Sequence, residues 1–185
     1  MISEQARSSI DYLFTEAARS SLVLHPDDKC SIQPVVKDAS TAVSVSGTVL
    51  IITCSSFAFR LLTLLHLGDD TETVAYYAQG ATAEGNSADA LFEAANLCTG
   101  AMNRELSRHF PHVGMSTPYS LSGACLLHLE ELQPQHVLSY EITIRESVRL
   151  QAAVCLCSYA PIDFSVNRVS ATDAATTGEL ELFEQ

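Results

Sequence analysis

The segment from residue 86 to residue 110 constrains the fold most, because its apolar spacing is that of a long amphipathic helix. Five apolar side chains recur at helical intervals on one side: Leu91, Ala95, Cys98, Met102 and Leu106. Asn86 or Ser87 is suited to be the N-cap, and Pro111 ends the pattern near Phe110. The apolar stripe needs a second layer to cover it, so we expect this helix to pack on a core.

The rest of the chain places pairs of strands between helices. A first helix is predicted over residues 3–22 and a second over 56–67, with Gly68 at its end and a short helical stretch possible over 74–77. Strands are predicted over residues 31–37, 42–54, 119–129, 137–146 and 148–159, with a polar turn over 37–40. Paired strands argue against a doubly wound parallel sheet. We therefore predict an α+β two-layer sandwich, with long helices packed on one face of an antiparallel sheet.

Length and composition indicate one globular domain. The chain has 185 residues, of which 47% are hydrophobic and 17% are charged. A chain of this size can bury a full core. We assign the domain to residues 1–164 and expect residues 165–185 to be an acidic, weakly ordered C-terminal extension.

The charge of the chain excludes several classes of partner. There are 22 acidic and 10 Lys or Arg side chains, giving a net charge of −12, and the basic residues form no cluster. A nucleic-acid backbone or an anionic membrane surface would be repelled. No basic segment precedes an apolar one at the N-terminus, and the densest apolar run, over 48–54, is too short to span a bilayer. We expect a soluble cytoplasmic protein.

The cysteines and histidines do not form a recognisable metal site. None of the six cysteines belongs to a C-x-x-C motif, and all lie in or beside apolar segments, so we expect buried reduced thiols. His109 and His112 are closely spaced, but Pro111 between them breaks the helix that would aim both rings at one ion. We expect no metal ligands.

The polar side of the helix over 86–110 carries the most informative pair of residues. Glu93 and Asn96 are three positions apart, so a carboxylate and a carboxamide share one face. Gly100, Asn103 and Ser107 continue this face with small or amide side chains, which could lie close against another molecule. The alternative is an ordinary solvated helix face.

These residues also resemble a known family. The pattern Glu-x-x-Asn-x-x-x-Gly, formed by Glu93, Asn96 and Gly100 and followed by the Thr-Pro segment over 115–123, resembles the CheC, CheX and FliY chemotaxis phosphatases. The single copy of the motif is most similar to CheX. The family often has glycine before the motif glutamate, whereas this chain has Phe92, which could alter how closely a partner approaches. The expected partner-binding residues are therefore Phe92, Gly100 and Asn103.

The resemblance implies an aspartyl-phosphate phosphatase that acts on a phosphorylated CheY-like receiver protein. Asn96 would orient the attacking water and Glu93 would pair with a receiver lysine. A carboxamide can accept from and donate to water without adding negative charge near the phosphoryl group. The receiver would supply Mg²⁺, so the chain needs no cofactor of its own. The resemblance also implies a homodimer formed by edge-strand pairing, for which the predicted strand over 148–159 lacks an edge-blocking lysine or proline.

Two other functions stay open. A non-catalytic adaptor of the same fold could bind a response regulator or a flagellar or signalling protein, and a small-molecule-binding domain is a more remote option. The first helix contains Glu-Ala-Ala-Arg over 16–19, which echoes Glu-Ala-Ala-Asn over 93–96. The family contains an internal repeat, and in this chain Arg19 would leave the first copy inactive. A chance similarity between two alanine-rich helices explains this match better than an internal repeat does.

Overall fold

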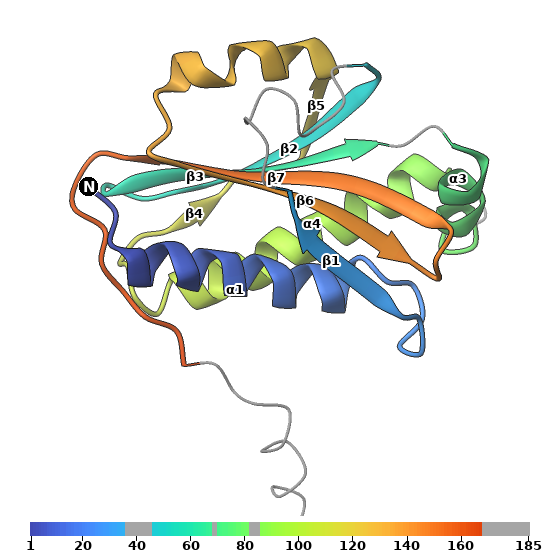
Figure 1. The fold of residues 1–185 in the computed structure, drawn as a ribbon, viewed down its shortest axis with the longest axis horizontal. Coiled ribbons are helices and arrows are strands. Elements are labelled where there is room, and N and C mark those ends of the chain that lie inside the picture. The colour runs from blue at the N-terminus through green and yellow to red at the C-terminus, as the bar shows by residue number, and fades with distance from the viewer. Residues whose placement is uncertain (36–45, 68–69, 82–85, 168–185) are drawn as a thin grey trace, which may run out of the picture.

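The computed structural model describes residues 1–35, 46–67, 70–81 and 86–167. Within these ranges seven strands form one antiparallel sheet in the order β1-β6-β7-β3-β2, with β4 and β5 both paired to the outer side of β2 (Figure 1). The strands are β1 (Cys30–Pro34), β2 (Thr48–Ser55), β3 (Phe59–Leu67), β4 (Gly114–Met115), β5 (Tyr119–Ser122), β6 (His136–Ile144) and β7 (Val148–Ser158). The predicted α+β sandwich with an antiparallel sheet is confirmed.

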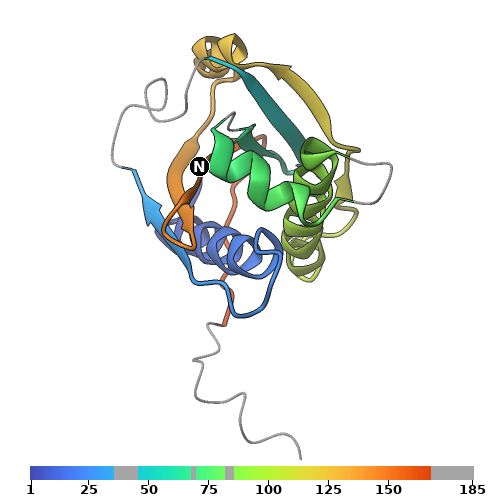
Figure 2. The ribbon, with the colours of Figure 1, turned by 90° about the vertical axis from the view of Figure 1, so that its right-hand side faces the viewer.

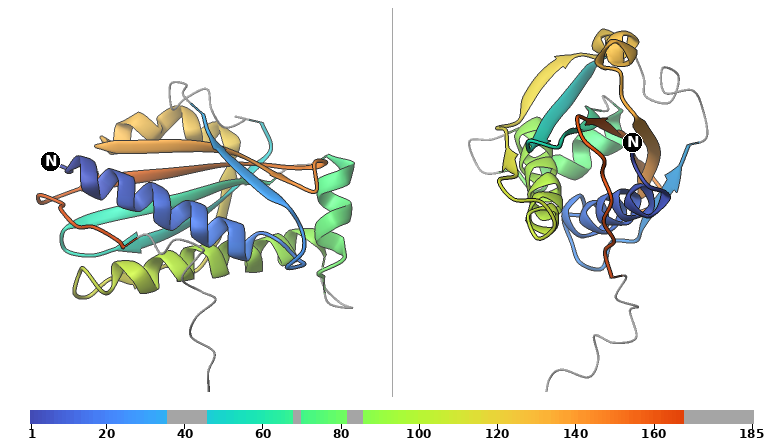
Figure 3. Two further views of the ribbon diagram at one scale, coloured as in Figure 1. Left: turned by 60° about the horizontal axis from the view of Figure 1, so that its bottom comes forward. Right: turned by 90° about the vertical axis from the view of Figure 1, so that its left-hand side faces the viewer.

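Two long helices cover one face of the sheet. Helices α1 (Glu4–Ser21) and α4 (Ser87–Leu106) lie side by side there (Figure 3). The Ser3 side chain caps α1 by accepting a hydrogen bond from the amide of Ala6 at 3.1 Å. Helix α4 ends at Leu106, one turn before the predicted end near Phe110.

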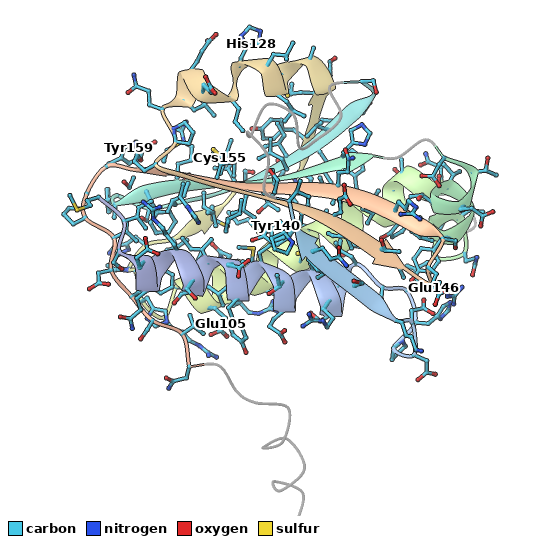
Figure 4. All side chains as sticks on the ribbon, viewed as in Figure 1. Glu105, His128, Tyr140, Glu146, Cys155 and Tyr159 are labelled. Atoms are coloured by element: carbon cyan, nitrogen blue, oxygen red, sulfur yellow. The ribbon has the colours of Figure 1, made fainter. Side chains whose placement is uncertain are left out.

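The main core lies between these helices and the sheet. The ring of Phe14 from α1 stacks on that of Tyr140 from β6, with 4.5 Å between the ring centroids. Figure 4 shows Tyr140 between α1 and the sheet. The Tyr140 hydroxyl donates to a carboxylate oxygen of Asp11 at 2.9 Å, so its polar end is satisfied inside an apolar layer.

Helix α3 (Thr71–Ala78) closes one end of this core. It includes the stretch over 74–77 that was predicted to be helical. Tyr77 is fully buried, and its hydroxyl donates to the carbonyl oxygen of Leu22 at 2.7 Å. The contact ties the end of α1 to α3, so α1, α3 and α4 form a continuous cover on this side of the sheet (Figure 2).

A second, smaller apolar cluster lies on the opposite face. The 3₁₀ helix η1 (Gly123–Leu132) packs Leu126 and Leu129 against this face, three residues apart as its geometry requires. The cluster contains Val49, Ile51, Leu62, Leu64, Leu126, Leu129, Ala153, Cys155 and Cys157. Figure 4 shows His128 of η1 and Glu105 of α4 on opposite sides of the sheet.

The predicted helix over 56–67 is wrong, because this segment forms β3. Strand β3 pairs with β2 along one edge and with β7 along the other, and an apolar cluster covers each of its faces. Leu61 and Leu65 belong to the main core, whereas Leu62 and Leu64 belong to the second cluster. A strand buried on both faces has a continuous apolar sequence, which local pattern cannot distinguish from a buried helix. Gly68 lies outside the described residues.

Two further strand predictions need correction. The strand predicted over 119–129 ends at Ser122, whose side chain caps η1 by accepting from the amide of Ala124. The strand predicted over 148–159 is found as β7, but it cannot provide the edge for the predicted dimer, since it pairs with β3 and β6 along most of its length. The strands predicted over 31–37, 42–54 and 137–146 are found as β1, β2 and β6 in the described ranges, whereas the turn over 37–40 lies outside them.

Candidate functional site

Helix α4 presents the predicted pair of polar residues on its outer side. The Asn86 side chain accepts from the amide of Asp89 at 3.1 Å, and the Asp89 carboxylate accepts from the amide of Asn86 at 3.0 Å. This capping box fixes the first turn just before Glu93. Glu93 is exposed and Asn96 is partly exposed. The five residues of the apolar stripe are each at most 4% exposed, so the predicted division of the helix into two faces is confirmed.

Glu93 and Asn96 are not engaged by other side chains. Neither makes a hydrogen bond or ion pair through its side chain with the residues that the structure describes. In α1, by contrast, the carboxylate of Glu16 forms an ion pair with the guanidinium of Arg19. Glu93 and Asn96 therefore remain available to bind another molecule.

The helix surface beyond this pair is open at one position. A Cβ atom added at Gly100 would meet no heavy atom within 4 Å, so a partner can approach the backbone there. Asn103, one turn further, is only partly exposed. Its side-chain oxygen is buried and has no hydrogen-bond partner in the described part of the chain.

Phe92 is placed differently from the other predicted partner-binding residues. Its ring is partly buried and packs against the main core. Gly100 is the residue of the predicted set Phe92, Gly100 and Asn103 that offers open space around it.

The Thr-Pro segment after α4 lies at the edge of the sheet beside that helix. Strands β4 and β5 both pair with β2, and α4 contacts β2, β3 and β4. Ser116, between β4 and β5, donates its amide to the carbonyl of Thr53 at 2.8 Å and accepts from the Thr53 amide through its hydroxyl at 3.0 Å. The segment is thus fixed to β2 and forms part of the support for α4.

The described residues offer no metal site. No three His, Cys, Asp or Glu side chains among them come together in a way that could hold an ion. His109 packs on Phe164 and His112 packs on Phe57, so the two rings have different neighbours. All six cysteines are free thiols, and burial raises the pKa of Cys98, under the candidate site, to about 12. In these ranges no helix is both long and apolar enough to cross a membrane.

Two side chains of this surface were not singled out from the sequence. Leu97 is 53% exposed between Glu93 and Gly100, and Arg104 is exposed beyond them. The sequence signal is their spacing, since they lie four and eleven residues after Glu93 and so share its side of the helix. An exposed, convex helix face carrying a free carboxylate, a free carboxamide and an open glycine is suited to a macromolecular partner.

Comparison with known proteins supports the fold. No protein-family model and no curated protein sequence matches the chain. Several solved structures are similar at low sequence identity, among them the following three. The chemotaxis protein CheX from Vibrio vulnificus is 16% identical, with a TM-score of 0.56 over 78% of this chain and 97% of that chain. A CheC-like superfamily protein from Shewanella sp. PV-4 is 15% identical, with a TM-score of 0.55 over 80% and 97%.

The third structure is a complex. The match in the CheX–CheY–BeF₃–Mg²⁺ complex from Borrelia burgdorferi is 14% identical, with a TM-score of 0.55 over 80% of this chain and 97% of that chain. At these identities the comparisons concern the fold, and they agree with the antiparallel sheet and the two helices on one face. The chain therefore has the fold of the CheX and CheC-like chemotaxis proteins.

Proposed function

We propose that this protein is a phosphatase that hydrolyses the aspartyl phosphate of a CheY-like receiver domain. The observation that carries the proposal is the pair of unengaged side chains, Glu93 and Asn96, on the outer face of α4. Their motif resembles that of the chemotaxis phosphatases, and the chain shares its fold with a CheX protein solved in complex with CheY.

The reaction needs a well-placed water more than it needs new catalytic groups. The water oxygen attacks phosphorus in line with the aspartyl oxygen, and the phosphorus–oxygen bond breaks with its electron pair staying on the aspartate carboxylate. Both water protons end on the inorganic phosphate, which leaves as dihydrogen phosphate. The receiver supplies Mg²⁺ and a lysine that neutralise charge, so the phosphatase needs no metal of its own. The Asn96 carboxamide holds the water by accepting or donating one hydrogen bond.

Glu93 has a different role, which is to bind the receiver. Its free carboxylate pairs with the receiver lysine and sets Asn96 over the phosphoryl group. Glu93→Ala is expected to weaken binding to the phosphorylated receiver by about tenfold, because it removes one charged contact at the interface. Titration of the receiver by fluorescence anisotropy, with the beryllofluoride-loaded form to prevent turnover, measures this change.

The direct test follows loss of phosphate from a Mg²⁺-loaded phosphorylated receiver, with and without the purified protein. Acceleration that persists after the protein has been treated with a chelator and dialysed supports the proposal, including the absence of a metal requirement. The alternative to the phosphatase is a non-catalytic adaptor. It is favoured by Phe92, a bulky residue at the position before the motif glutamate where the family often has glycine. Binding to the receiver with no acceleration at any protein concentration would establish the adaptor function in its place.

We also propose that the protein is a homodimer. Among the described strands, β1, β4 and β5 each pair on one side only, so an edge pairing would use one of these and not β7. Light scattering at tens of micromolar protein is expected to give about twice the chain mass of 20.0 kDa. A mass equal to one chain would refute the dimer.

A further inference from the structure

The outer side of α4 carries a line of four residues that extends well beyond the catalytic pair. Glu93, Leu97, Gly100 and Arg104 follow one another at intervals of four, three and four residues, so they lie in a row along the helix. At 1.5 Å per residue, the row is about 16 Å long. We call these four residues the α4 row.

The centre of the α4 row is apolar and open. Leu97 is 53% exposed although it lies in the middle of a long helix, and Gly100 leaves free space beside it. A single exposed leucine is common on protein surfaces. Here it is flanked by an open glycine and two charged residues, which is the arrangement of an apolar anchor surrounded by polar contacts.

The two ends of the α4 row carry opposite charges, and both are unpaired within the described residues. Arg104 has no ion pair there, and neither has Glu93. Three other arginines form ion pairs, Arg19 with Glu16, Arg108 with Glu105, and Arg145 with Asp28. Arg60 and Arg149 are exposed and, like Arg104, have no ion pair within the described residues. In a chain with 22 acidic and 10 basic side chains, an unpaired arginine is a local departure from the general charge.

A groove lies beside the positive end of the row. It has a volume of about 660 Å³, and it runs between α1 and α4. Its lining includes Tyr12 and Glu16 from α1, and Ala101, Arg104 and Arg108 from α4. Since Glu16 is already paired with Arg19, the unpaired charge at this groove is that of Arg104.

We propose that the receiver docks along the α4 row in one fixed direction. Its lysine faces Glu93, an apolar side chain packs on Leu97, its backbone approaches Gly100, and an acidic side chain about 16 Å from the lysine reaches Arg104 at the groove. The identity of the partner rests on the proposed function. The direction follows from charge, because the reversed orientation would place like charges opposite each other at both ends.

A charge reversal at each of two matched arginines tests the direction. Arg60 is also exposed and has no ion pair in the described ranges, but it lies on β3, on the sheet face opposite to the helices. Arg104→Glu is expected to weaken binding to the beryllofluoride-loaded receiver by about tenfold or more, whereas Arg60→Glu changes it by less than about twofold. The rate of dephosphorylation at saturating protein should stay within about twofold for Arg60→Glu, since Arg60 lies on the sheet face opposite to the helices.

A second pair of variants tests the apolar anchor. Leu97→Ser is expected to weaken binding by about tenfold, whereas Leu127→Ser, at a leucine that is 61% exposed on η1, leaves binding unchanged. Circular dichroism melting of all four variants shows that each is folded. Equal binding by the Arg104 and Arg60 variants, or by the two leucine variants, would overturn the docking proposal.

The binding assay separates this proposal from the proposed function. If the wild-type protein binds the receiver without accelerating phosphate loss, the phosphatase function fails, while the four variants still test the row. If phosphate loss is accelerated and the variants bind alike, the docking proposal fails alone. If no binding to any receiver is found, both are wrong.

Discussion

Asn96→Ala should abolish nearly all of the acceleration of receiver dephosphorylation, by about 100-fold at saturating protein, while the affinity for the receiver changes little. In the proposed mechanism the carboxamide orients the attacking water, and placing one water correctly is worth on the order of 2.7 kcal/mol. Because Asn96 contributes little contact area, its loss should leave docking intact. Phosphate release and binding, measured on the same receiver, separate the two effects.

Two controls make this test specific. Asn96→Asp keeps the shape of the side chain and adds a negative charge next to the phosphoryl group, so we expect it to be as inactive as Asn96→Ala. The thermal stability of Asn96→Ala should be equal to or above that of the wild type, since alanine is the better helix former at a partly exposed site. A dephosphorylation rate unchanged by Asn96→Ala, with a receiver that the protein binds, would refute the phosphatase assignment.

Leu61→Ala and Leu62→Ala should each lower the free energy of unfolding by about 2–5 kcal/mol. The two residues are adjacent in β3 and point to opposite faces of the sheet. Leu61 is 1% exposed in the main core and Leu62 is 7% exposed in the second cluster. Both substitutions therefore leave a cavity in packed surroundings.

Chemical denaturation measures these two losses against Leu127→Ala as the control. Leu127 is exposed on η1, so its truncation should change stability by no more than about 0.5 kcal/mol. A small effect at either Leu61 or Leu62 would therefore contradict a strand covered on both faces.

The contrast between α4 and β3 shows what the sequence could predict about this fold. Helix α4 has one apolar face, and its spacing of 3.6 residues identifies both its extent and its orientation. Strand β3 has two apolar faces, so its sequence does not alternate between apolar and polar residues, and its polar residues Arg60, Thr63 and His66 instead recur at a helix-like spacing. Its leucines favour a helix locally, and the pairing with β2 and β7 decides otherwise.

The same limit applies to the candidate site. The spacing of Glu93 and Asn96 was enough to place both on the outer face of α4. The sequence alone could not identify Leu97 and Arg104 as binding residues. Their exposure and their lack of an ion pair depend on which other parts of the fold lie near them. The burial of the Asn103 side-chain oxygen was likewise outside the reach of a sequence pattern.

The ion pair between Glu16 and Arg19 in α1 has a consequence for stoichiometry. These residues occupy the positions in α1 that Glu93 and Asn96 occupy in the similar stretch of α4, but the carboxylate is already neutralised by its own neighbour. Of these two similar stretches, the one in α4 has the carboxylate without an ion pair among the described residues. We therefore expect a titration to saturate at one receiver per chain, so that a dimer would carry two receivers.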